Sequence, residues 1–184
     1  MKTLPDYLAP DLRIISVGLN PSPNSVRCGY PYATPQNRFW RALNGSQIVS
    51  SERPPGIESM RRLLAEDRIG FTDVVKRPTA GAGELRAADY RHWVPVTLAK
   101  LEQCQPRVVW FQGKMSYRNF LRYAGNNRRA EVSWGAQPEV CAGARVFVTP
   151  NPSAANAAYS LDDITQWFDR LAAYVGAQRP GARN

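Results

Sequence analysis

Residues Leu12 to Leu19 (LRIISVGL) form a short run of apolar and β-branched side chains that leads directly into the turn-forming residues Asn20 to Asn24 (NPSPN). This pattern predicts a buried strand that ends in a loop. Two later segments, Arg107 to Gly113 (RVVWFQG) and Ala144 to Thr149 (ARVFVT), have the same character, and an apolar pattern also covers Ile69 to Val75 (IGFTDVV). These segments are the candidate strands of the fold.

Helical patterns separate the candidate strands. Apolar residues recur at three- and four-residue spacing in Ile57 to Leu64, and the closing segment from Leu161 to Val175 is also amphipathic. Further helices are predicted at residues 37–43, with Asn37 near the cap, and at residues 87–103 and 114–123. This alternation predicts a three-layer α/β/α architecture with a central, four-stranded, mainly parallel sheet covered on both faces.

Ligands of such sheets bind in the loops beyond the carboxyl ends of the strands. Two Asn-Pro loops, which begin at Asn20 and at Asn151, leave strands at that edge. The chain of 184 residues fits one domain, predicted to cover residues 1–176, with residues 177–184 as a frayed tail. We therefore expect one pocket with several loop walls.

The composition restricts the possible functions. Lys and Arg number 24 against 15 Asp and Glu, and the resulting net charge of +9 favours a polyanionic partner, with nucleic acid first. The single histidine excludes a His-rich zinc site, and three cysteines cannot supply the four thiolates of a typical iron–sulfur cluster. The phosphate-binding, dinucleotide-binding and esterase motifs of common α/β enzymes are absent. We expect no metal and no cofactor.

The cysteine spacing and the apolar stretches of the sequence predict the cellular compartment. The three cysteines have no C-x-x-C spacing, which favours a reducing compartment. No apolar stretch approaches 18 residues, and the first ten residues lack the apolar run of a signal peptide. The sequence predicts a cytoplasmic protein without a membrane partner, which associates with the nucleoid through DNA.

Two polar or aromatic residues stand out in the loop after the first strand. Asn20 is held between a buried strand and two prolines, where an amide can position a water or a base edge, although Asn before Pro is also common in ordinary turns. Tyr32 follows Pro31 in the same loop and can stack on a flat heterocycle or pack in the core. The residues alone leave both alternatives open.

These segments resemble known motifs. Residues 18–21 (GLNP), 29–35 (GYPYATP) and 37–40 (NRFW) are similar to the first motif of the mismatch-specific uracil-DNA and thymine-DNA glycosylases. The similarity continues, in family order, through residues 70–79 (GFTDVVKRPT), 105–107 (QPR), 113–114 (GK), 134–135 (WG) and 150–153 (PNPS). It covers nearly the whole chain.

The resemblance implies a uracil-DNA glycosylase fold and a monofunctional enzyme that cleaves the bond between a damaged base and its deoxyribose. Such an enzyme extrudes the nucleotide from the duplex. By motif position, Asn20 holds the attacking water and touches the base, Tyr32 stacks on the flipped pyrimidine, and Leu19 lines the pocket through its backbone. The implied partner is double-stranded DNA that contains uracil, with single-stranded DNA as a further possibility, and the protein is expected to be a monomer.

Asp73 departs from the family pattern, because relatives often carry Lys or Asn at this position. A carboxylate there could activate water as a second catalytic group. The alternatives are a helix cap or an ion-pair partner for Arg77. The neighbouring Thr72 could contact the base or simply pack.

The second Asn-Pro loop matches the segment that enters the minor groove and fills the gap left by the flipped base. Its residues are Ser153, Ala154, Ala155, Asn156 and Ala157. The alanines offer little volume to replace lost stacking, which predicts weak holding of the product and weak reading of an opposite guanine. Asn151, at the start of the loop, is expected in the base pocket, although an Asx turn would explain it equally well.

Four basic residues near these loops could contact phosphates or belong to a solvated surface. They are Arg38, Lys76, Arg77 and Lys114. The function predicted first is removal of uracil from DNA, notably from G·U mismatches. The alternatives are a glycosylase for a broader range of deaminated bases, including hypoxanthine and xanthine, and a catalytically weak DNA-binding module.

Overall fold

A five-stranded sheet forms the centre of the computed structural model, which describes residues 2–125 and 131–177. The strand order is β2-β1-β3-β5-β4, and all neighbouring pairs are parallel except β4 with β5. The strands are β1 (Ile14–Gly18), β2 (Ile69–Asp73), β3 (Val108–Gln112), β4 (Gly135–Cys141) and β5 (Ala144–Thr149). All of the expected frayed tail except residue 177 lies outside the described residues.

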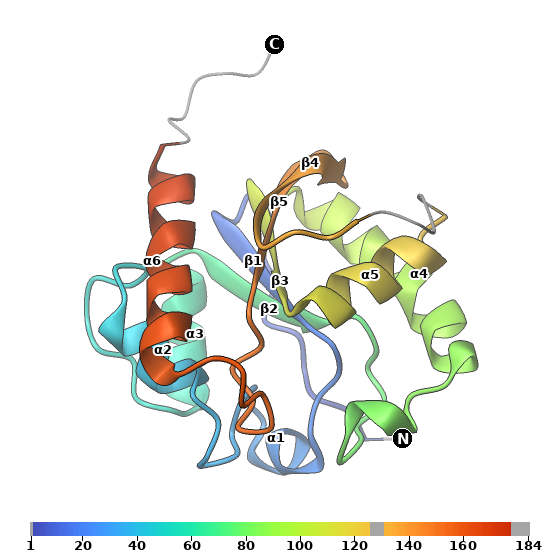
Figure 1. Cartoon of the computed structure of the whole chain (residues 1–184), viewed down its shortest axis with the longest axis horizontal. Helices are drawn as coiled ribbons and strands as arrows, with labels where there is room; N and C mark the ends of the chain where they lie inside the picture. The colour runs from blue at the N-terminus through green and yellow to red at the C-terminus, as the bar shows by residue number, and fades with distance from the viewer. Residues whose placement is uncertain (1, 126–130, 178–184) are drawn as a thin grey trace.

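Helices cover both faces of the sheet (Figure 1). One layer contains α2 (Phe39–Gly45), α3 (Ile57–Ala65) and α6 (Leu161–Gly176), and the other contains α4 (Ala87–Cys104) and α5 (Lys114–Tyr123). Each layer packs against the sheet through its own cluster of buried apolar side chains. The predicted three-layer architecture is confirmed.

The expectation of four strands was wrong, because the edge strand β4 was not predicted. Its sequence, GAQPEVC, contains Pro138 and has several exposed positions, so it lacks the apolar pattern of the other strands. Proline removes a ladder donor and is tolerated at edge strands and bulges. The register between β4 and β5 shifts between Ala136 and Val140, which is where the proline lies.

A short helix, α1 (Pro23–Cys28), occupies part of the segment that was predicted to be a loop. The side chain of Ser22 caps it by accepting a hydrogen bond from the Ser25 backbone N–H at 3.1 Å. Pro23 stands at its first position and Gly29 ends it with a φ of 80°. Serine and proline here start a helix rather than a turn.

The loops after β1, β2 and β5 gather at one edge of the sheet (Figure 1). The N-terminal segment lies beside them, because Tyr7 pairs with Phe71 of β2 through two backbone hydrogen bonds of 3.0 and 2.8 Å. Further toward the terminus, Thr3 donates to the Lys76 carbonyl at 2.5 Å. Within residues 2–125 and 131–177, no helix is both long and apolar enough to cross a membrane.

Candidate active site

Asn20 ties the loop after β1 to the loop after β2. Its side-chain nitrogen donates to Thr79 Oγ1 at 2.7 Å and to the Arg77 carbonyl at 3.0 Å. The two loops are also joined by the Val75 N–H, which donates to the Leu19 carbonyl at 2.9 Å. Because these contacts occupy the amide nitrogen, Asn20 Oδ1 is the atom that can accept a hydrogen bond from a ligand.

Tyr32 lies against the aromatic core. Its ring stacks on Phe39 with a centroid distance of 4.1 Å, and Phe39 in turn contacts Trp110 and Phe71. The backbone of Tyr32 has a φ of 59°, in the left-handed region that is unfavourable for most residues. Burial, with the Asp73 carboxylate as a second cause, raises the pKa of the phenol, so Tyr32 stays neutral. One ring face of Tyr32 is covered by Phe39.

Gly18 allows Asp73 and Tyr32 to approach the end of β1. A Cβ atom at this position would lie 2.7 Å from Asp73 Oδ1 and 3.6 Å from the Tyr32 hydroxyl. The residue opposite Gly18 in the sheet register is Asp73 itself, which is only 7% exposed. The three residues therefore meet at the carboxyl ends of β1 and β2.

A small pocket opens beside this junction. It is lined by Leu4, Pro5, Pro31, Tyr32, Phe71, Thr72 and Asp73. Strand β2, the loop after α1 and the N-terminal segment all contribute to it. The predicted residues Tyr32, Thr72 and Asp73 thus share one pocket.

Asp73 belongs to a buried cluster of charges. Its Oδ2 atom lies 3.3 Å from Lys76 Nζ, and the same ammonium lies 2.7 Å from Asp6 Oδ1. Lys100 Nζ contacts the other oxygen of Asp6 at 2.6 Å, and the Thr72 hydroxyl donates to Asp6 Oδ1 at 2.8 Å. Nothing in the sequence pattern pointed to Asp6, which precedes the first motif and lies 66 residues from Thr72 along the chain.

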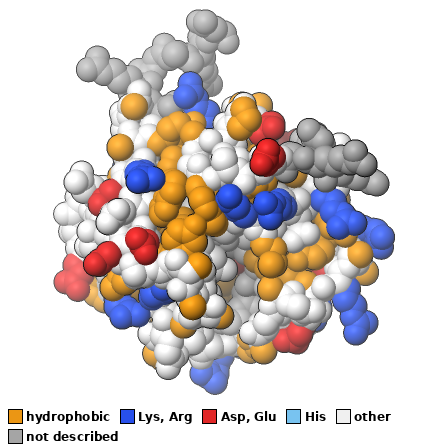
Figure 2. Space-filling model, viewed as in Figure 1, with side chains coloured by type: hydrophobic (Ala, Val, Ile, Leu, Met, Phe, Trp, Pro, Cys, Tyr) orange, Lys and Arg blue, Asp and Glu red, His pale blue; other side chains and the backbone are white. Residues whose placement is uncertain are grey.

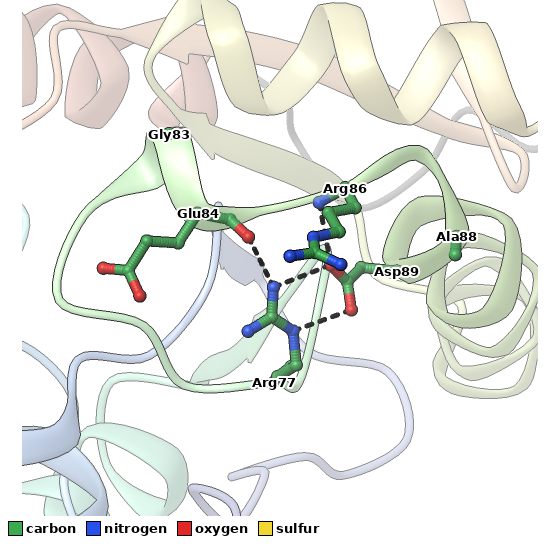
Figure 3. A pocket seen from close by; sticks show the side chains of 6 residues that line it. All are labelled: Arg77, Gly83, Glu84, Arg86, Ala88 and Asp89. Atoms are coloured by element: carbon green, nitrogen blue, oxygen red, sulfur yellow. Dashed lines mark hydrogen bonds and ion pairs between the residues drawn. The ribbon is translucent and has the colours of Figure 1, made fainter.

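Burial raises the pKa of Asp73, and the Asp6 carboxylate adds to this rise, while the Lys76 ammonium opposes it. The ion-pair partner of Asp73 is therefore Lys76, rather than the Arg77 considered from the sequence. Arg77 instead contacts both carboxylate oxygens of Asp89, at 2.8 and 2.9 Å, and the Glu84 carbonyl at 2.6 Å (Figure 3). A raised pKa makes the ionised Asp73 carboxylate a stronger base.

The structure changes the interpretation of the predicted phosphate contacts. Lys76 is 3% exposed and lies between two carboxylates, so the expectation that it contacts a phosphate was wrong. The guanidinium of Arg77 is occupied by Asp89. Lys114 stands at the start of α5 with its ammonium 4.6 Å from the centre of the Trp134 ring, and its phosphate contact stays a prediction.

Arg38 holds the second Asn-Pro loop through hydrogen bonds and is partly exposed. Its guanidinium donates to the backbone carbonyls of Ser153 at 2.6 Å, Asn156 at 2.8 Å, Pro152 at 3.4 Å, and Tyr159. Its backbone N–H donates to Pro152 as well, at 3.0 Å. Because its donors are directed into the loop, Arg38 supports the loop, and its predicted phosphate contact stays a prediction.

The loop that Arg38 supports also contains its own turns. Asn151 Oδ1 accepts from the Ser153 N–H at 2.8 Å, and the Asn156 side chain donates to the Asn151 carbonyl at 2.9 Å. The Asx turn considered from the sequence is therefore present. Ala154, Ala155 and Ala157 are exposed, which presents small apolar groups at the surface. The role of the loop in DNA stays a prediction.

The face shown in Figure 2 carries Lys and Arg side chains around a central hollow. Apolar side chains gather beside them on the same face. Within the described ranges 2–125 and 131–177, no cluster of three or more His, Cys, Asp or Glu side chains has the arrangement of a metal site.

Comparisons with known proteins identify the family of this chain. The Uracil DNA glycosylase superfamily matches residues 5–174. The chain belongs to this superfamily. A similar solved structure is the NMR structure of a candidate uracil DNA glycosylase from Methanosarcina acetivorans, with a TM-score of 0.62 and 21% identity. The similarity covers 95% of this chain and 98% of that one, and it shows the shared fold.

Membership of the uracil DNA glycosylase superfamily makes DNA the partner to consider for the loop that Arg38 supports. We expect Arg38→Lys to weaken DNA binding several-fold in KM while changing kcat less, because lysine keeps the charge but cannot reach several carbonyls at once. Single-turnover base release over a range of enzyme concentrations measures both quantities. The matched control is Arg41→Lys on the exposed side of α2. A loss in Arg38→Lys no larger than that in Arg41→Lys would show that the hydrogen bonds from Arg38 to the loop do not contribute to DNA binding.

Proposed function

We propose that this protein is a monofunctional uracil-DNA glycosylase of the mismatch-specific type, which flips uracil out of double-stranded DNA and hydrolyses its N-glycosidic bond. The observation that carries the proposal is the meeting of Gly18, Tyr32 and Asp73 at the carboxyl ends of β1 and β2, with Asn20 two residues beyond Gly18. Superfamily membership supports DNA glycosylase activity. Uracil and the mismatch preference come from the resemblance of the motifs.

In the proposed reaction, the flipped base stacks on the Tyr32 ring. Asn20 Oδ1 accepts a hydrogen bond from the attacking water, because the amide nitrogen is already held by Thr79 and Arg77. The water oxygen forms a bond to C1′ of the sugar as the bond from C1′ to the base breaks, and the electron pair leaves with the base. Asp73 takes the proton that the water loses.

The pKa of Asp73 sets the direction of the pH dependence. The carboxyl must be ionised to accept a proton, and burial raises its pKa above the ordinary value. The rate of base release is therefore expected to fall as the pH drops through this raised pKa. A carboxylate that remains ionised at low pH would give no such decline.

A second candidate function is excision of a broader range of deaminated bases. Asp73 favours it, because a carboxyl accepts a hydrogen bond when ionised and donates one when protonated, and so can face more than one base edge. The exposed alanines of the loop at residues 153–157 favour weak reading of the opposite base. This candidate uses the same pocket as the first.

A panel of labelled duplexes tests these proposals. We expect single-turnover release of uracil to be fastest from U·G, and release from U·A to be slower but measurable because the inserted loop is small. Single strands that contain uracil and duplexes with T·G and hypoxanthine·T measure the range of substrates. Cleavage of U·G without any cleavage of U·A would contradict the predicted weak reading of guanine. Comparable release of hypoxanthine would favour the broader enzyme.

The monomeric state is tested in the same preparation. We propose that one copy of the protein acts on each DNA lesion. Sedimentation of the protein with and without duplex measures the stoichiometry. An obligate dimer on a single lesion would contradict this proposal.

A further inference from the structure

Asp6 lies outside the motifs but contacts the centre of the candidate site. It comes from the N-terminal segment, which the pairing of Tyr7 with Phe71 fixes along the edge of β2. Its side chain receives one hydrogen bond from the Thr72 hydroxyl and one ammonium at each oxygen. Thr72 and the two lysines belong to β2, the following loop and α4, so Asp6 joins three separate elements.

The distances show which carboxylate holds Lys76. Lys76 Nζ lies 2.7 Å from Asp6 and 3.3 Å from Asp73, so the closer ion pair is formed with Asp6. Lys76 is buried and has little water to screen its charge. Without the Asp6 carboxylate, Asp73 would be the remaining counter-ion of a buried ammonium.

We propose that Asp6 is a positioning residue that forms the shorter of the two ion pairs of Lys76, so that this ammonium neutralises Asp73 less and the Asp73 carboxyl is able to act as a base. Asp73 Oδ1 then remains directed toward Gly18, where the proposed reaction needs it. The proposal rests on the proposed function in one respect, which is the role of Asp73 as the base of the reaction. The interaction between Asp6 and Asp73 can be measured without any DNA.

The charges around Asp73 determine the direction in which each substitution should move its pKa. Lys76, Asp6 and Lys100 act on its pKa, and Tyr32 faces it as a neutral phenol. Asp6 raises the pKa of Asp73, whereas both ammonium groups lower it. Burial acts to raise the pKa of Asp6 itself, but Lys76, Lys100 and Thr72 outweigh burial and keep it below its usual range. Asp6 therefore stays ionised while Asp73 titrates.

The experiment is a titration of side-chain carboxyl ¹³C signals by NMR in the full-length protein. Asp73→Asn assigns the Asp73 signal by its disappearance. In Asp6→Asn the midpoint of Asp73 is expected to move to lower pH, because a negative charge beside it is lost. In Lys100→Gln the midpoint is expected to move to higher pH, because a positive charge is lost. Asp162→Asn, an exposed change of the same type on α6, is the control and should cause no shift.

Opposite shifts in the two variants support the proposal, since general loosening of the fold would move both midpoints in the same direction. Absence of a shift in either variant, or shifts of the same sign, would overturn it. If Asp6→Asn fails to fold, Lys100→Gln still tests the proposal. A midpoint of Asp73 that does not move to higher pH in this variant would contradict it. Failure of the proposed function would appear separately, as intact uracil duplex in the base-release assay with the wild-type protein.

The rate profile then connects the titration with catalysis. Asp6→Asn should move the acid inflection of single-turnover release to lower pH and lower the plateau, with little change in KM for the duplex. In an Asp73→Asn background the same change should leave the profile unaltered. An effect of Asp6→Asn that persists without Asp73 would show that Asp6 acts only on stability.

Discussion

Asn20→Ala is expected to reduce the single-turnover rate of uracil release by about 100-fold or more, because it removes the acceptor that orients the attacking water. Binding of the duplex should change little, since Asn20 does not contribute charge. Asn20 also joins the loops after β1 and β2 through Thr79 and Arg77, so some of the loss comes from the displaced loop. The measurement is release of the base at enzyme excess.

Two controls separate these effects. Thr79→Val removes the 2.7 Å bond to the Asn20 amide but keeps Asn20 Oδ1, so we expect a much smaller loss of rate. Asn119→Ala, on α5, removes an asparagine whose side chain, among the described residues, donates to the Met115 carbonyl in its own helix, and should have no effect. A loss of rate in Thr79→Val as large as that in Asn20→Ala would mean that the position of the loop, rather than Asn20 Oδ1, determines the rate of uracil release.

Phe39→Ala is expected to lower the free energy of unfolding by about 3–5 kcal/mol, the usual cost of removing a buried aromatic ring. Phe39 is fully buried and lies against Trp110, Phe168 and Phe71. The same change removes the ring on which Tyr32 stacks. Urea unfolding measures the loss of stability.

The matched control is Phe120→Ala, in the cluster on the other face of the sheet. It should cost a similar free energy of unfolding but leave the base-release rate of the folded protein near that of the wild type. Phe39→Ala should lose activity even under conditions in which it is fully folded, because Tyr32 is no longer held. A Phe39→Ala protein that is folded and fully active would contradict the assigned role of this stack.

The strands of the sheet interior were predictable because each is an apolar run bounded by turn residues. The edge strand β4 was not predictable, because only some of its side chains are buried and its sequence contains Pro138. Helix α1 was missed for a different reason. Ser22 and Pro23 serve equally well in a turn and at a helix start, and only the position of the Ser25 N–H distinguishes the two.

The candidate site was predictable in its motif residues and not in their partners. Tyr32 and Asp73 follow motif segments whose strands end at the same edge, so parallel topology brings them together. The partners of Lys76 and Arg38 depend on segments far away in sequence, namely the N-terminal segment and the loop before α6. The position of a basic side chain near a motif loop does not indicate whether it will bind a carboxylate, a backbone carbonyl or a phosphate.

The central claim is that this edge of the sheet hydrolyses the bond between uracil and its sugar. The most direct measurement is the appearance of free uracil from a U·G duplex at enzyme excess, with an Asn20→Ala, Asp73→Asn double variant as the inactive reference. We predict one uracil and one abasic site for each duplex with the wild type, and almost none with the double variant. A wild-type protein that binds the duplex and leaves it intact would contradict the claim and indicate a DNA-binding module.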